Sequence, residues 1–136
     1  TVERRTKELG IDDRVVFVGR VPHESVPAYL AAADAAVLPD GTDIICPIKI
    51  LEYMAMGVPP VLPDYEANRE VVDHDVTGLL FEPGNPKSLH DQLRRLQKNP
   101  DLKRRLGTAA REQAKNRFSW EATWGRAIEY VHEKTR

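Results

Sequence analysis

The feature that most constrains the fold is residues 40–64, where a polar loop leads into a helix and then into a second apolar segment. Residues 35–39 form a short apolar run with a valine, which predicts a buried strand before the loop. Pro47 suits the first helical position, because its fixed φ fits there and its missing N–H would have no partner. Gly57 ends the helix, since glycine tolerates the left-handed conformation beyond the last turn. Residues 58–62 predict the next buried strand, so the stretch is one strand–helix–strand unit of a parallel sheet.

The loop and the first helical turn of this unit form the expected ligand site, because parallel sheets bind ligands outside the carboxyl ends of their strands. Free N–H groups and a partial positive charge at a helix start suit a phosphate. Lys49 strengthens this prediction, since a cation in the first turn costs roughly a few tenths of a kcal/mol unless an anion lies nearby. A surface ion pair of Lys49 with Glu52 is the alternative, although lysine before glutamate is the less favourable order on a helix. Both interpretations stay open.

The remaining residues predict further strands and helices and then a helical region. The helix of the central unit has two faces, one with Ile48, Leu51 and Ala55 and the other with Lys49, Glu52, Tyr53 and Met56. The elements expected around it are a helix at residues 1–9 stopped by Gly10, a buried strand at 15–18, a helix at 24–33, a short helix at 67–72 and a last strand at 77–81. A turn follows at residues 83–86.

The segment after residue 86 is rich in helix formers and is broken at Asn99-Pro100, with Ser119 as a good N-cap for the last helix. Its basic residues are Arg94, Arg95, Lys98, Lys103, Arg104 and Arg105, for which a solvated helix face is favoured over a membrane-facing patch. Another set recurs at helical spacing and predicts packing positions rather than a sugar-stacking platform, namely Trp120, Trp124, Ile128 and Val131.

Residues 52–61, Glu-Tyr-Met-Ala-Met-Gly-Val-Pro-Pro-Val, resemble the Glu-Ala-Met-Ala-x-Gly-x-Pro-Val-Val signature of family 4 glycosyltransferases, which have the GT-B fold. Other landmarks of that family occur in the same order at residues 15–19, 29–35, 38–39, 70–72, 77–80 and 117–120. The resemblance covers nearly the whole chain. It implies an α/β fold class, a Rossmann-like parallel sheet of the GT-B C-terminal domain followed by C-terminal helices. Residues 1–136 would form one partial donor-binding domain, with an α/β part at 1–86 and helices at 87–136.

The resemblance also implies roles for particular residues. Glu52 matches the family's glutamate on the nucleotide ribose, whereas the glutamate expected near the donor sugar would fall on Ile44 and is absent. Residues 46–53 resemble a branch of the family with a Ser-Pro-x-Lys-x-x-Glu-Tyr motif, in which Lys49 would bind phosphate. Lys49 and Glu52 are therefore the catalytic candidates. The other donor-binding candidates are Arg20, Val21, Asp43, Cys46, Pro47 and Ile48.

Several of these residues have a second interpretation. Asp43 is the only residue beside Ile44 with the chemistry of the absent glutamate. For Arg20, a solvated surface charge and a ligand contact are equally open. Cys46 stands where the branch has serine, and a small residue at a helix start is favoured over a reactive thiol. His23 is interpreted as a polar residue at a helix start rather than as a catalytic acid or base.

The family's strand order, 3-2-1-4-5-6, places two strands between the strand at residues 15–18 and the strand at 35–39. Neither strand is present after Thr1, and without them the strand at 15–18 would have no partner for its backbone groups. We therefore expect the chain to be a fragment, inactive alone, whose first strands are missing. In the family the missing part grips the donor diphosphate, and the acceptor binds in a separate N-terminal domain.

The leading hypothesis is the donor-binding part of a retaining glycosyltransferase that uses a nucleoside diphosphate sugar, without a metal or other cofactor. The alternative is a non-catalytic glycosyltransferase-like module that completes another chain. A net charge of −1 gives no reason to expect nucleic acid. One cysteine and no signal or spanning segment predict a cytoplasmic protein, and a peripheral position at a membrane surface stays open without being indicated.

Overall fold

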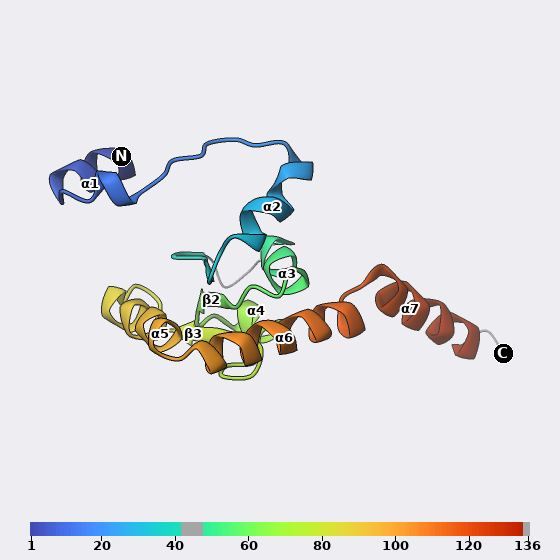
Figure 1. Cartoon of the computed structure of the whole chain (residues 1–136). Helices are drawn as coiled ribbons and strands as arrows, with labels where there is room; N and C mark the ends of the chain where they lie inside the picture. The colour runs from blue at the N-terminus through green and yellow to red at the C-terminus, as the bar shows by residue number, and fades with distance from the viewer. Residues whose placement is uncertain (42–47, 135–136) are drawn as a thin grey trace.

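The computed structural model describes residues 1–41 and 48–134, which include a parallel sheet with helices packed on it, while the first and last helices extend away from the sheet (Figure 1). The strands are β1 Ala36–Val37, β2 Pro60–Pro63 and β3 Leu79–Phe81. Their order in the sheet is β1-β2-β3, and both pairings are parallel. The expected strands near residues 35–39, 58–62 and 77–81 are therefore present.

The helices follow the predicted order. They are α1 Val2–Glu8, the 3₁₀ turns η1 Asp12–Arg14 and η2 His23–Ser25, α2 Val26–Ala31, α3 Ile48–Ala55, α4 Glu66–Arg69, α5 Pro86–Lys98, α6 Pro100–Arg117 and α7 Trp120–Lys134. Gly10 and Gly57 follow α1 and α3 with φ of 64° and 72°, so they end these helices in the left-handed region. The Asn99 side chain accepts a bond of 2.9 Å from the Leu102 N–H and caps α6.

Side chains of the sheet alternate between two apolar layers, as the two-residue period of a strand requires. On one side Leu38, Leu62 and Leu80 pack with α3 and the second half of α6. On the other side Val61, Leu79 and Phe81 pack with α5 and the first half of α6. Figure 1 shows α6 running from α5 along the sheet toward α7. Because α6 contributes to both layers, it fixes α3 relative to α5.

The contact between α6 and the end of α3 depends on a glycine. A Cβ built on Gly107 would lie 2.2 Å from the Gly57 carbonyl oxygen, far inside van der Waals contact. The atom in the way is backbone and cannot turn aside as a side chain can. Gly107 therefore allows α6 to approach the turn that ends α3.

Replacing Gly107 by alanine is expected to destabilise the fold by about 1–3 kcal/mol, because the new methyl group overpacks this contact. The matched control is Gly125→Ala on α7, where a Cβ meets nothing within 4 Å. That change should be neutral or stabilise by up to about 1 kcal/mol, since alanine favours a helix. Urea unfolding of both variants measures the difference, and equal effects would contradict the close contact.

The outer edge of β3 is closed by groups from its own neighbourhood. The Leu80 N–H donates to His74 Nδ1 at 2.9 Å, and the Glu82 N–H donates to Ser88 Oγ at 3.0 Å. The Gly78 carbonyl accepts from the Asp75 N–H at 2.9 Å. These bonds satisfy groups that would otherwise pair with another strand. At the opposite edge of the sheet, no strand of the described residues pairs with β1.

The predicted buried strand at residues 15–18 is wrong for this structure. Val15 has an extended backbone with φ −118° and ψ 122°, but the segment joins no strand of the described sheet. Val16 is 84% exposed, and Phe17 and Val18 are also exposed. Figure 1 shows the segment as a long connection between α2 and α1, which stands away from the sheet. The physical reason is that the segment has no neighbouring strand to pair with.

The face of α3 that packs on the sheet also differs from the two faces read from the sequence. Ile50 and Met54 are fully buried, whereas Ile48 is 77% exposed and Ala55 is exposed. Apolar residues occur around most of this helix, so spacing alone selects no single buried face. Packing against the sheet and α6 selects the buried face of the helix. It places Ile50 and Met54, which are four residues apart, in the core.

Candidate functional site

The carboxyl ends of the three strands meet at one edge of the described sheet, as parallel pairing requires. Asp40 and Gly41 follow β1, and Asp64 follows β2. A Cβ on Gly41 would lie 3.9 Å from the Tyr65 ring, so the loops after β1 and β2 lie against each other. The described part of α3 begins at Ile48 and places its first turn at this edge.

Lys49 lies in that first turn and is exposed. Within residues 1–41 and 48–134, no carboxylate lies within ion-pair distance of its ammonium group. The surface pair with Glu52 considered from the sequence therefore does not form. A cation at this place opposes the helix dipole, so its charge is compensated by no described group.

Glu52 lies one turn further along α3 and faces a residue from a distant part of the chain. Its Oε1 is 3.9 Å from His23 Nδ1, and its side chain is 34% exposed. Partial burial, and then the charge of Glu52, raise the pKa of the neighbouring Tyr53 hydroxyl. The carboxylate is therefore partly exposed beside the His23 imidazole, and its charge acts on the half-buried Tyr53.

The structure describes three of the other predicted donor-binding residues, and the remaining three lie outside the described residues. Arg20 is exposed and Val21 is half-buried in the loop just before His23, so the His23–Glu52 contact brings this loop toward α3. Ile48 is exposed at the start of α3. Asp43, Cys46 and Pro47 lie outside the described residues. The contact of His23 with Glu52 was not predicted, because it joins residues far apart in sequence that share no motif.

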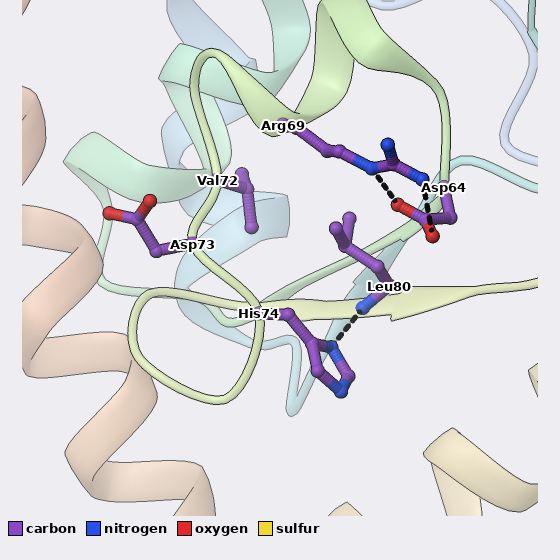
Figure 2. Close-up of a pocket in the computed structure, with 6 residues that line it drawn as sticks. All are labelled: Asp64, Arg69, Val72, Asp73, His74 and Leu80. Carbon is purple, nitrogen blue, oxygen red and sulfur yellow. Dashed lines mark hydrogen bonds and ion pairs between the residues drawn. The ribbon is translucent and has the colours of Figure 1, made fainter.

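A second concave site lies beside β3 and was not predicted from the sequence. It has a volume of about 380 Å³ and is lined by Asp64, Arg69, Val72, Asp73, His74 and Leu80 (Figure 2). Arg69 donates to both carboxylate oxygens of Asp64, from Nε at 2.6 Å and from Nη2 at 2.9 Å. This two-point pair ties α4 to the end of β2. An aspartate directly after a strand was the only sequence signal for it.

The hydrogen bonds from Arg69 hold the pKa of Asp64 below its ordinary value, and slight burial opposes them. A carboxylate with a lowered pKa in the folded state stabilises the protein above its unfolded pKa, and this contribution is lost as pH falls through the folded pKa. The pair is partly exposed, so its contribution is modest.

Arg69→Gln is expected to lower the free energy of unfolding by about 0.2–1 kcal/mol at pH 7, because it removes this pair. At pH 2.5 the difference from the unsubstituted chain should be smaller, since this contribution is lost as pH falls through the lowered pKa of Asp64. Urea unfolding at both pH values measures it. Arg94→Gln, on the exposed face of α5, is the control and should show no such dependence on pH. An undiminished loss at pH 2.5 would show that the pair is not the cause.

The basic residues of α5 and α6 largely bond within the chain. Arg95 Nη2 is 2.7 Å from Asp75 Oδ1, and Arg105 Nη1 donates to the Asp75 carbonyl at 2.9 Å. Lys103 pairs with Asp34 at the start of β1. These bonds fasten the loop before β3 and the connection before β1 to the helices. Their charges are partly neutralised, which weakens the case for a membrane-facing patch.

The prediction of packing positions on α7 is wrong for Trp120, Trp124 and Ile128 in this structure, and the side chain of Val131 lies outside the described part of the chain. Trp120 is 75% exposed, and Trp124 and Ile128 are also exposed. The two tryptophan rings stack with their centres 6.3 Å apart, beside a hollow of about 450 Å³ that Phe118 also lines. Figure 1 shows α7 extending past the end of α6, away from the sheet. No element of the described chain covers this apolar face.

Comparison with known proteins identifies the family. The sequence profile described as "Glycosyl transferases group 1" matches residues 1–113. The chain belongs to this glycosyltransferase family. The N-acetyl-alpha-D-glucosaminyl L-malate synthase of Bacillus anthracis is 34% identical over 118 residues, which are 87% of this chain and 30% of that protein. The D-inositol 3-phosphate glycosyltransferase of Corynebacterium efficiens is 33% identical over 116 residues, which are 85% of this chain and 27% of that protein. The chain thus spans less than a third of the length of these two relatives.

Solved structures of glycosyltransferases confirm the predicted fold class. The sucrose-phosphate synthase of Thermosynechococcus elongatus superposes with a TM-score of 0.84 at 28% identity, over 98% of this chain and 34% of that one. The Anabaena protein HepE, in complex with UDP, gives a TM-score of 0.87 at 23% identity, over 97% of this chain and 36% of that one. The α/β arrangement is therefore that of a GT-B glycosyltransferase.

The described residues offer neither a cluster of metal ligands nor a helix that could span a membrane. They contain no group of three or more His, Cys, Asp or Glu side chains placed to hold a metal ion. In residues 1–41 and 48–134, no helix has both the length and the apolar character needed to cross a membrane.

Proposed function

We propose that the chain is the donor-binding part of a retaining family 4 glycosyltransferase, which transfers a sugar from a nucleoside diphosphate sugar to an acceptor. The observation that carries this proposal is the charge of Lys49 at the start of α3, at the edge where the strands end, which no carboxylate of the described residues compensates. Family membership supports it, as does the UDP bound by the similarly folded HepE. The proposed reaction needs no metal or other cofactor, and the proposed location is the cytoplasm.

Lys49 and the free N–H groups at the start of α3 would stabilise the diphosphate leaving group. Negative charge grows on that group as the glycosidic bond breaks, so a fixed cation there lowers the barrier. Glu52 would accept hydrogen bonds from the ribose hydroxyls. Residues three apart on a helix have Cβ atoms about 5–6 Å apart, so the two side chains reach neighbouring parts of one nucleotide.

The remaining predicted residues complete this proposed site. Arg20 and Val21, in the loop that leads to His23, would lie against the base. Cys46 and Ile48 would bring backbone N–H groups to the diphosphate, and Pro47, which has no N–H, would fix the backbone at the helix start. Asp43 would take the position nearest the sugar, where the family usually has a glutamate.

Lys49→Met is expected to weaken binding of a nucleoside diphosphate about tenfold or more, because it removes a charge-assisted contact. The same variant should bind the corresponding nucleoside normally, whereas Glu52→Ala should weaken both ligands. Isothermal titration of the natural polypeptide that contains residues 1–136 measures this, with the tightest binder among UDP, GDP and ADP. Lys87→Met is the control, since Lys87 pairs with Asp91 on α5. Unchanged affinities in both site variants would remove the basis of the proposal.

We also propose that further strands and an acceptor domain lie elsewhere in the natural polypeptide. The edge of β3 is closed by side chains, whereas the β1 edge pairs with no described strand. The apolar segment at residues 15–18 and the exposed face of α7 supply surfaces that such parts would cover. This arrangement would follow the strand order 3-2-1-4-5-6.

Hydrogen exchange tests the added strands. In residues 1–136 alone, the amides of residues 15–18 should exchange at nearly the rate of an unfolded chain, while Val61 and Leu62 of β2 are protected. In the natural polypeptide the amides of residues 15–18 should become protected roughly 100-fold or more. Unprotected amides in both proteins would mean that the segment pairs with no strand.

A non-catalytic glycosyltransferase-like module is the second candidate. One sequence observation favours it, because Ile44 replaces the glutamate expected near the donor sugar. Such a module would still bind a nucleotide through Lys49 and Glu52 but would not break the glycosidic bond. Hydrolysis or transfer of the sugar by the natural polypeptide, lost in Lys49→Met, would distinguish the enzyme from the module.

A further inference from the structure

His23 makes a contact that its position in the sequence does not explain. It opens η2, but η2 has no side-chain cap, and neither has α2, which follows it. Instead its Nδ1 lies 3.9 Å from Glu52 Oε1 on α3. His23 is 86% exposed and Glu52 34% exposed, so the imidazole lies on the solvent side of the carboxylate.

We infer that His23 is a positioning residue for Glu52, which rests on the proposed role of Glu52 in binding the ribose. A carboxylate has two oxygens with about four acceptor directions. At 3.9 Å the imidazole forms no hydrogen bond with Oε1, but in its charged form it attracts the carboxylate and restricts rotation of the glutamate side chain. Both oxygens then stay available to a pair of ribose hydroxyls, at a smaller cost in side-chain entropy when the nucleotide binds.

The other ionisable groups around Glu52 do not take this role. Lys49 is one turn back on α3 and, in the described chain, forms no ion pair with Glu52. Tyr53 is adjacent in sequence, and the charge of Glu52 acts on its hydroxyl without a hydrogen bond. Of the described cationic side chains, His23 is the one within ion-pair distance of Glu52. It also comes from outside α3, so it connects the loop of Arg20 and Val21 to the carboxylate.

This arrangement makes nucleotide affinity depend on pH. Histidine is the side chain that changes charge between about pH 5 and 8, and its charged form holds a carboxylate more strongly. A nucleoside diphosphate sugar has no phosphate group that gains a proton in that range, because its terminal phosphate is esterified. The affinity for such a ligand should therefore increase from pH 8 to pH 6 by about 2- to 5-fold, the range of an exposed ion pair.

The test uses the natural polypeptide that contains residues 1–136 and the tightest binder among UDP-glucose, GDP-glucose and ADP-glucose. Isothermal titration at pH 6 and pH 8 should show the pH dependence in the unsubstituted protein. It should show weak binding at both pH values for His23→Gln, and tight binding at both for His23→Arg, whose charge is permanent. His90→Gln is the control, because His90 is exposed on α5, where it lies within ion-pair distance of its neighbour Asp91. It should keep the dependence.

Glu52→Gln separates this inference from the proposed function. If Glu52→Gln weakens binding while His23→Gln retains the original affinity and pH dependence, the inference about His23 is wrong and the proposed function stands. If Glu52→Gln leaves binding unchanged, or if no donor binds, the ribose role fails and the inference fails with it. A pH dependence present in both unsubstituted protein and His23→Gln also overturns the inference, since another group then causes it.

Discussion

The structure depends on one constraint, that a parallel sheet must be covered on both faces by helices from the same chain. Alternating side chains of β2 and β3 divide the core into two layers, and α6 contributes to both of them. The close contact of Gly107 with the end of α3 fixes the depth at which that helix lies. The position of Lys49 at the strand ends therefore follows from core packing, since α3 has one orientation in which Ile50 and Met54 are buried.

Local signals in the sequence predicted the elements well, because their causes are local. Gly10, Gly57 and Asn99 each act within a turn of their own helix, through backbone conformation or a side-chain cap. The prediction of a strand at residues 15–18 failed because a strand needs a neighbouring strand to bond its backbone groups. The prediction that the tryptophans of α7 are packing positions failed for a related reason. Helical spacing shows that a face is apolar, but it does not show what covers that face.

In the candidate site, too, the features with local causes could be predicted and those that depend on distant parts of the chain could not. Lys49 could be singled out because the conflict between a cation and a helix start is visible within a few residues. The contact between His23 and Glu52 could not be found in this way, because it depends on the path of the chain from η2 to α3. The pair of Asp64 and Arg69 is intermediate, since both residues are close in sequence but their meeting depends on how α4 leaves β2.

The unequal edges of the sheet have a consequence for self-association. Open-ended stacking of copies through their sheets needs two complementary free edges on each molecule, so that every copy can accept one neighbour and offer itself to another. His74 and Ser88 occupy the N–H groups of Leu80 and Glu82 at the β3 edge, so among the described strands only β1 has an edge left for strand exchange. Two copies joined through β1 would close on each other and stop. The His74 imidazole and the Ser88 hydroxyl, which lie beside β3, thus oppose the growth of a fibre through the sheet.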